Sequence, residues 1–192
     1  MKSNISRFML GALIMAASLT SYAQNSNTAT ITLNAAVAES ITVGLSGNTQ
    51  TWASLTPGSA TNAGSGPITV TTNWVLLPGR TQLRLYAFFA STVALASVSG
   101  GAGSVDIPTS AFQINSASLG ALTTVNQDNT AASIGVAGSS LILRTTAITG
   151  VNKNGSSSDA LSFNIDLSSL AMQQLPADTY QGTLNIMAQA TP

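Results

Sequence analysis

The chain alternates between apolar and polar positions with a period of two over a long stretch near its N-terminus. Apart from the acidic residue at position 39, the odd positions from 29 to 45 are apolar: Ala29, Ile31, Leu33, Ala35, Val37, Ile41, Val43 and Leu45. A period of two predicts a half-buried β-strand, whereas a helix needs apolar residues three and four positions apart. The pattern therefore predicts two consecutive strands or one long bent strand.

The same alternation recurs along the rest of the chain. Residues 68–76 and 83–89 carry apolar side chains on one face each, and Pro78-Gly79 lies between them, so a hairpin is predicted around residues 77–81. Further strands are predicted at residues 111–115, 122–125, 141–148, 161–167 and 179–190. Trp74 and Phe163 fall on the inward faces and should be buried. Eight to ten short strands indicate an all-β fold, a two-sheet antiparallel sandwich.

The segments between these strands are rich in Gly, Ser, Ala and Asn and are predicted to be surface loops. They cover residues 56–66, 97–104, 126–140 and 149–158. Within the last one, Asn154-Gly155 is typical of a tight turn. A single helical turn is predicted at residues 168–174, before Pro176.

The first 23 residues have the pattern of a signal peptide. Lys2 and Arg7 precede an apolar run over residues 8–19, and Ser21 and Ala23 are the small residues of a cleavage site. The run is shorter than the roughly 20 residues that span a bilayer. We therefore expect cleavage between Ala23 and Gln24, no membrane span in the mature chain, a single domain over residues 24–192, and a secreted, periplasmic or cell-surface location.

Charge and reactive side chains are scarce. Charged residues make up 6% of the sequence, and after removal of the signal peptide four basic and six acidic residues leave a net charge of −2. Such a surface has no basic stripe, so nucleic-acid binding is not expected. Without His and Cys, the common metal sites and nucleophile triads cannot be built. The sequence predicts no catalytic, cofactor-binding or metal-binding residue, and Asp128 is interpreted as part of a solvated loop.

Two aromatic side chains are candidates for an exposed patch. Tyr86 and Phe88 occupy the polar phase of their predicted strand, beside Arg84. This patch supports one alternative function, a secreted β-sandwich module that binds glycan or matrix.

The two ends of the chain resemble those of cysteine-free major pilins, subunits of chaperone–usher fimbriae. The resemblance is carried by the signal peptide, the alternating strand that follows it, and a closing pattern of Ala-x-x-Tyr-x-Gly over residues 177–182 that runs into Leu184, Ile186 and Met187. Secreted coat-type β-sandwich proteins end similarly. The resemblance implies an immunoglobulin-like sandwich and a structural role in a surface filament or coat and in cell adhesion. The partners it implies are other copies of the chain (self-association) or related subunits, and a periplasmic chaperone.

The resemblance also implies a role for residues 28–39, which we call the N-terminal segment. In such a subunit an incomplete sandwich is completed by the strand of a neighbour, which generates a head-to-tail filament. The side chains that would fill the neighbour are Ile31, Leu33, Ala35 and Val37. The alternative is a complete sandwich in which this strand pairs within its own chain, since the odd apolar phase continues past Glu39.

Overall fold

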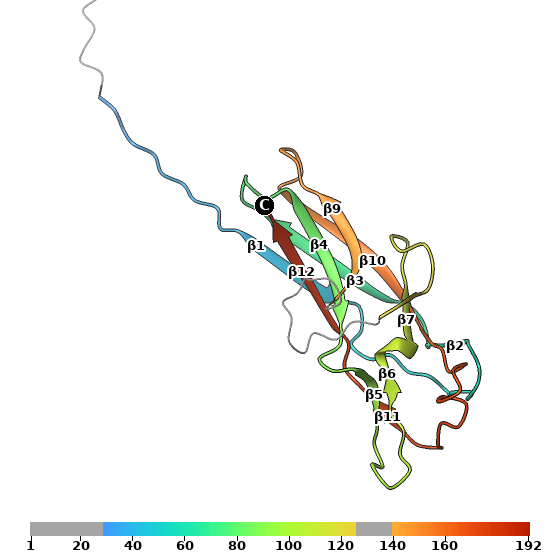
Figure 1. Ribbon diagram of the computed structural model, residues 1–192. Coiled ribbons are helices and arrows are strands. Elements are labelled where there is room, and N and C mark those ends of the chain that lie inside the picture. The colour runs from blue at the N-terminus through green and yellow to red at the C-terminus, as the bar shows by residue number, and fades with distance from the viewer. Residues whose placement is uncertain (1–28, 126–139) are drawn as a thin grey trace, which may run out of the picture. The chain divides into compact units, whose positions relative to one another are not determined.

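The computed structural model describes residues 29–125 and 140–192 (Figure 1). The chain divides into two compact units, Met1–Ala36 and Val37–Pro192. The predicted signal peptide, its cleavage site at Ala23 and Gln24, and Asp128 lie outside the described residues. Residues 29–39 form no strand or helix.

The larger of the two main sheets runs in the order β1-β3-β10-β7-β8, and β2 pairs with β10 beside this path. The strands are β1 (Ser40–Leu45), β2 (Asn62–Ala63), β3 (Ile68–Val75), β7 (Phe112–Asn115), β8 (Thr123–Thr124) and β10 (Asn154–Ile165). We call this the first sheet. Neighbouring strands pair antiparallel throughout, with Ile41 opposite Trp74 and Phe163 opposite Ile114.

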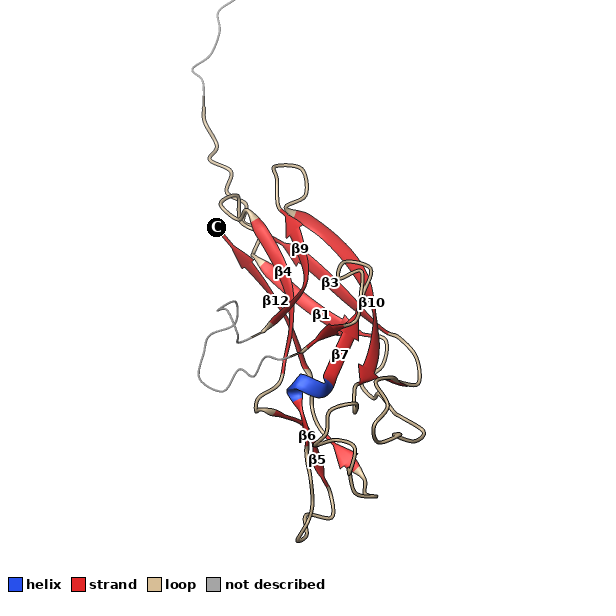
Figure 2. Ribbon diagram, turned by 45° about the vertical axis from the view of Figure 1, so that its right-hand side comes forward, coloured by secondary structure: helices blue, strands red, loops and turns tan. Residues whose placement is uncertain are grey.

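The second sheet has the order β12-β4-β9, and a small third sheet has the order β11-β5-β6 (Figure 2). Their strands are β4 (Gln82–Phe88), β5 (Val93–Ser97), β6 (Ile107–Pro108), β9 (Leu141–Ala147), β11 (Tyr180–Gln181) and β12 (Asn185–Thr191), and a short 3-10 helix, η1 (Thr109–Ala111), follows β6. These pairs are antiparallel too. The fold is therefore all-β, as predicted. The strands β2, β5 and β6 were not predicted, because they are too short or too uniformly apolar to show alternation.

The core lies between the first and second sheets, where the inward side chains of both are buried. Val70 and Leu161 come from the first sheet, and Leu85 and Leu143 come from the second. Trp74 and Phe163 are 5% and 7% exposed, which confirms the predicted burial. Period-two patterning identified this core because alternate residues of a strand point to opposite faces of its sheet.

The predicted hairpin between the segments at 68–76 and 83–89 is wrong. β3 pairs with β1 and β10, whereas β4 pairs with β12 and β9, so the turn around Pro78 carries the chain from one sheet to the other. Sequence patterning gives the inward face of each strand. It does not distinguish a turn within one sheet from a connection between two facing sheets.

The tight turn predicted at Asn154-Gly155 is also wrong, because these two residues begin β10. Gly155 lies opposite Trp74, and a Cβ at Gly155 would lie 2.6 Å from Cζ2 of the indole. The glycine is therefore needed for a close approach of strand to side chain. The indole Nε1 donates a hydrogen bond to the carbonyl of Asn152 at 2.9 Å.

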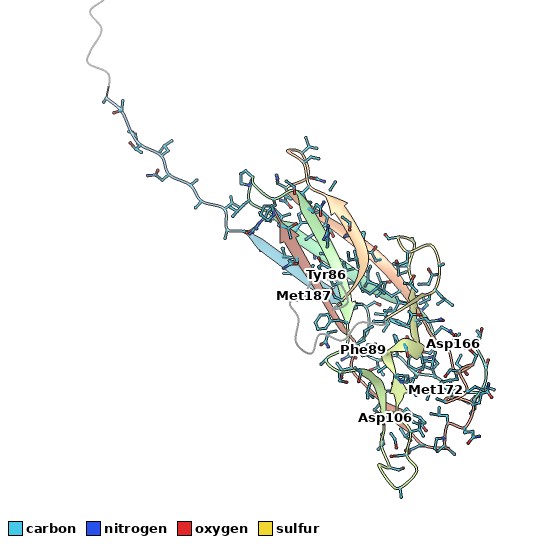
Figure 3. All side chains as sticks on the ribbon, in the orientation of Figure 1. Tyr86, Phe89, Asp106, Asp166, Met172 and Met187 are labelled. Carbon is cyan, nitrogen blue, oxygen red and sulfur yellow. The ribbon has the colours of Figure 1, made fainter. Side chains whose placement is uncertain are left out.

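The exposed patch predicted around Tyr86 is corrected by the structure. Tyr86 is fully buried, while Arg84 and Phe88 are half-buried. β4 is the central strand of the second sheet, and Tyr86 lies opposite Ile142 of β9 and Met187 of β12. Figure 3 labels Tyr86 and Met187 on their two neighbouring strands. Side chains of both neighbouring strands flank the ring, which the sequence of one strand cannot indicate.

Candidate functional site

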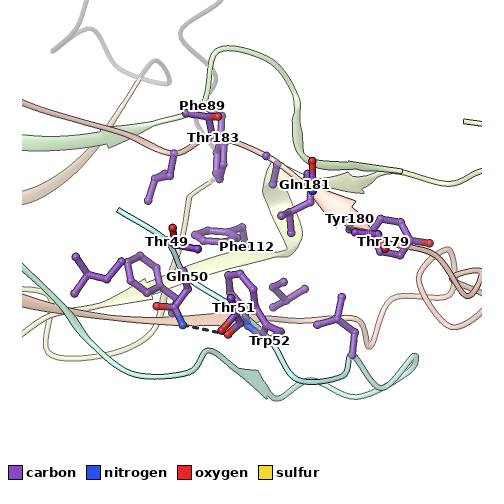
Figure 4. A pocket seen from close by; sticks show the side chains of 18 of the residues that line it. Thr49, Gln50, Thr51, Trp52, Phe89, Phe112, Thr179, Tyr180, Gln181 and Thr183 are labelled. Carbon is purple, nitrogen blue, oxygen red and sulfur yellow. Dashed lines mark hydrogen bonds between the residues drawn. The ribbon is translucent and has the colours of Figure 1, made fainter. Parts of the chain in front are cut away.

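A groove of about 1220 Å³ opens between two non-adjacent stretches of the chain. One wall is formed by residues 47–55, which follow β1, and the other by residues 175–184, which precede β12. Figure 4 shows Thr49, Gln50 and Trp52 on one side, Tyr180, Gln181 and Thr183 on the other, and Phe112 between them. The volume exceeds the 300–1,000 Å³ typical of small-molecule sites.

The floor of the groove is apolar and comes from the core of the sandwich. It is lined by side chains of both main sheets and of β5: Ile68, Val70, Phe89, Ala94, Leu95, Phe112, Leu161, Phe163, Ile165 and Ile186. Phe112 is central to it, and its ring makes edge contacts with Trp52 and Phe89 at centroid distances of 6.0 and 5.2 Å. The groove is therefore a gap that gives access to the hydrophobic core.

The wall at residues 47–55 is held by the chain that runs beside it. The amide of Ser65 donates to the carbonyl of Thr51 at 2.9 Å, and the Trp52 indole Nε1 donates to the carbonyl of Asn62 at 3.0 Å. Asn62 is buried, and its Oδ1 accepts from the amide of Thr56 at 2.7 Å. These bonds fix the wall without placing it in a sheet.

Asp178 attaches the opposite wall to the loop after β5. Its carboxylate accepts hydrogen bonds from the hydroxyl of Ser97, from the hydroxyl of Ser99 at 2.6 Å and from the amide of Ser99 at 3.2 Å. The Ser97 bond is the largest cause of a fall in the pKa of Asp178 from 3.8 to about 2. Asp178 is also the one charged residue that lines the groove in the described part of the chain.

Tyr180 and Gly182 explain why the closing pattern has these residue types at this spacing. The Tyr180 hydroxyl donates to the carbonyl of Pro176 at 2.7 Å, and burial raises its pKa. At Gly182 the chain crosses Ala94 so closely that a Cβ would lie 1.8 Å from the Ala94 carbonyl oxygen. The predicted strand at 179–190 is therefore divided into β11, which pairs with β5, and β12, which pairs with β4.

Neither wall is completed by a neighbouring strand on its groove side. Among the described strands β1 pairs with β3 alone, β11 with β5 alone and β12 with β4 alone, and no described hydrogen bond joins the two walls. Alongside β1 itself the two sheets approach, since Cα atoms of β1 and β12 come within 8 Å. A strand inserted between two others needs about 9.5 Å, twice the usual strand spacing. The edge is therefore closed at β1 and open beyond Leu45.

The predicted strand-exchange residues are exposed. Ile31 and Leu33, in the first unit, are 84% and 88% exposed, and Val37, at the start of the second unit, is 81% exposed. Ala35 is exposed as well. Arg84, Tyr86 and Phe88 lie on β4 and do not line the groove. Sequence reasoning missed the wall at 47–55, whose residues show no period, although the Tyr-x-Gly pattern marked the other wall.

The described residues also bear on two other kinds of site, a metal site and a membrane span. No three acidic side chains come together there in a group that could hold a metal ion. No helix in this part of the chain is long and apolar enough to cross a membrane.

Comparison with known proteins gives no assignment. No family model matches the chain, and a search of curated proteins finds no match.

Proposed function

We propose that the protein is an exported structural subunit of a bacterial surface filament or coat, and that it polymerises by strand exchange. The N-terminal segment of one copy fills the groove of the next. The observation that carries this proposal is the apolar groove between two walls that no described hydrogen bond joins to each other, in a chain that also has exposed, alternating apolar side chains at residues 31–37. The export step depends on the signal peptide predicted from the sequence.

The N-terminal segment and the groove agree in chemistry. From Ile31 to Val37 an extended chain covers about 20 Å, which is less than the roughly 30 Å that nine residues of a wall could span if extended. The groove has an apolar floor and, among the residues that the structure describes, a single charged lining residue; residues 28–38 carry no charge. Burying Ile31, Leu33 and Val37 would contribute about 1.5–3 kcal/mol each, and backbone bonds to the walls would add to this.

The position of the opening favours a second copy as the donor. The N-terminal segment joins the domain at Ser40, the first residue of β1, and β12 comes within 8 Å of β1. To fill its own groove, the segment would have to reverse at Ser40 and pass six residues of β1 before it reached the opening beyond Leu45. The segment of a neighbouring copy meets no such obstacle. The contact is then head-to-tail and generates an open chain of subunits.

A mixing experiment with two full-length variants tests this function. Ile31→Asn/Leu33→Asn impairs the segment, and Ile68→Trp fills the groove from its floor. Each variant alone should be monomeric by size-exclusion chromatography with light scattering. Mixed together they should form a 1:1 dimer and nothing longer, because only one intact segment can meet one intact groove.

Two control variants make the same kinds of substitution at positions that strand exchange should not involve. Thr30→Asn/Thr32→Asn alters the polar face of the segment, and Ile142→Trp enlarges an exposed side chain of β9 away from the groove; both should polymerise like the unchanged chain. A monomeric unchanged chain, or a mixture of the two impaired variants that stays monomeric, would contradict strand exchange. The alternative of a glycan-binding or matrix-binding module receives no support from the buried Tyr86.

A further inference from the structure

Glu39 interrupts the apolar odd positions between residues 29 and 45 as their one charged member. Its Oε1 and Oε2 accept hydrogen bonds from Nε and Nη2 of Arg80, both at 2.9 Å, and Oε1 also accepts from the amide of Leu77 at 3.3 Å. Lys153 donates from Nζ to the carbonyl of Arg80. Glu39 is thereby tied to the β3–β4 connection immediately before β1 begins.

Without a charge at position 39, the alternating pattern would not specify which residue begins β1. The side-chain period of a strand is two, so a slip of two residues along β3 leaves every odd side chain facing the core. In that slipped register Val37 replaces Glu39, Glu39 replaces Ile41, and Ile41 replaces Val43. Further slips would bring Ala35, Leu33 and Ile31 into the first sheet, because they continue the same apolar phase.

The surroundings of Ile41 explain why the unchanged chain does not slip. Ile41 is half-buried and packs against a cluster formed by Trp74, Leu76, Leu83 and Ile148. A carboxylate moved into this place loses both hydrogen bonds from Arg80. It also enters apolar surroundings without a partner, and burying an unpaired charge is strongly unfavourable.

We infer that Glu39 sets the register of β1: held by Arg80, it makes Ser40 the first residue of the strand and keeps residues 29–38 out of the subunit's own sheet. Glu39 is a positioning residue, and it does not line the groove of its own chain. The inference rests on the proposed function, since only strand exchange requires that these residues stay available to a second copy.

The absence of cysteine from the chain allows the register to be measured directly. In the native register Thr42 lies opposite Asn73 on β3, and after a slip of two Ser40 would lie opposite Asn73. Residues directly opposite in an antiparallel pair have Cα atoms about 4.5–5.5 Å apart, which a disulfide can bridge. The pair Thr42→Cys/Asn73→Cys therefore reports the native register, and Ser40→Cys/Asn73→Cys reports the slipped one.

Each cysteine pair is introduced into the unchanged chain and into Glu39→Ile, and the disulfide fraction of the monomer is measured by mass spectrometry after mild oxidation. We expect the slipped disulfide to rise about tenfold or more in Glu39→Ile, because the penalty for burying the carboxylate is gone. The native disulfide should fall correspondingly. Glu39→Thr is the second variant in case Glu39→Ile aggregates. It removes the charge with a smaller gain in hydrophobicity and should shift the register in the same direction.

Thr32→Ile is the matched control, because it adds the same apolar side chain in the polar phase and should leave the native disulfide unchanged. The inference would be overturned if the fraction of native disulfide were equal in the unchanged chain, Glu39→Ile and Glu39→Thr, and the slipped disulfide did not increase in either variant. Because register is measured in monomers, the two proposals fail separately. If Glu39→Ile shifts the register but the unchanged protein never polymerises, Glu39 keeps its role and strand exchange is contradicted. If Glu39→Ile polymerises and keeps the native register, strand exchange stands and the role of Glu39 is contradicted.

Discussion

The two edges of the sandwich are built in different ways. Where β9 faces β10, Arg144 of the second sheet and Asp159 of the first form an ion pair, with Nη1 and Oδ2 2.8 Å apart. Arg144 also donates from Nη2 to the Ser157 hydroxyl. At the other edge β1 and β12 approach each other over part of their length, and beyond Leu45 the sheets separate around the groove.

This difference separates an edge that is held by side chains of the chain itself from one that, under the proposed function, a second copy completes. The β9–β10 edge is closed within the chain by side chains that are only 15% and 7% exposed. A β-bulge contributes, because the register between β4 and β9 shifts at Leu85 and Tyr86 and places Arg144 opposite the inward-facing Leu85. The open edge has an apolar lining, and no described hydrogen bond joins its two walls. We therefore expect damage at the closed edge to affect stability, and damage at the open edge to affect assembly.

The largest effect on stability is expected from breaking the closed edge. Arg144→Met leaves the carboxylate of Asp159 buried without its partner, which should lower the free energy of unfolding by about 3–5 kcal/mol. Urea denaturation followed by circular dichroism measures this loss.

Two further variants sharpen that result. Arg144→Met/Asp159→Leu replaces both charges and should recover most of the stability, since apolar groups can substitute for a buried pair. Arg84→Met removes an arginine that makes no ion pair within the described residues and should cost less than about 1 kcal/mol. If Arg144→Met were as mild as Arg84→Met, the ion pair would not be what closes this edge.

A smaller, local effect is expected at the open edge from the titration of Asp178. Its pKa lies at about 2 in the folded chain, below the ordinary 3.8. A lowered pKa contributes stability above the ordinary value, and that contribution is lost as the pH falls from 3.8 through 2. The wall at residues 175–184 should therefore loosen over this range.

Hydrogen exchange of individual backbone amides measures this loosening. The amides of Ser99 and Thr179 donate to Asp178, and they should exchange faster relative to their intrinsic rates as the carboxyl is protonated. Asp178→Asn should show the faster exchange at neutral pH already. The amide of Leu76, which donates to the carbonyl of Lys153, serves as the internal control and should not respond. Protection at Ser99 and Thr179 that stays constant from pH 5 to about 2 would argue against Asp178 as the anchor of this wall.

The sequence predicted the all-β class and the inward faces of the long strands, because burial on one face imposes a period of two. Trp74 and Phe163 are buried for this reason. The sequence could not predict which strands are neighbours. The turn at Pro78 connects two sheets, and Gly155 makes room for the Trp74 side chain and does not form a turn. Both depend on contacts between residues far apart in the chain.

The candidate site was predictable in part. The alternating residues from Ile31 to Val37 and the Tyr180-x-Gly182 pattern are visible in the sequence. The groove itself is not, because its opposite wall at residues 47–55 has neither period nor motif and is fixed by bonds to Asn62 and Ser65.

The most direct test of the account is the folding of a chain that lacks residues 25–38. If these residues complete a neighbour, the shortened chain keeps its own core and should fold, with a β-type circular dichroism spectrum and a cooperative thermal transition. A peptide of residues 28–39 should then stabilise it, by about 2.7 kcal/mol at a concentration one hundred times the Kd. The same peptide with asparagine in place of Ile31 and Leu33 should have no effect. A shortened chain that is unfolded, or one that folds and ignores the peptide at every concentration, would contradict strand exchange through this segment.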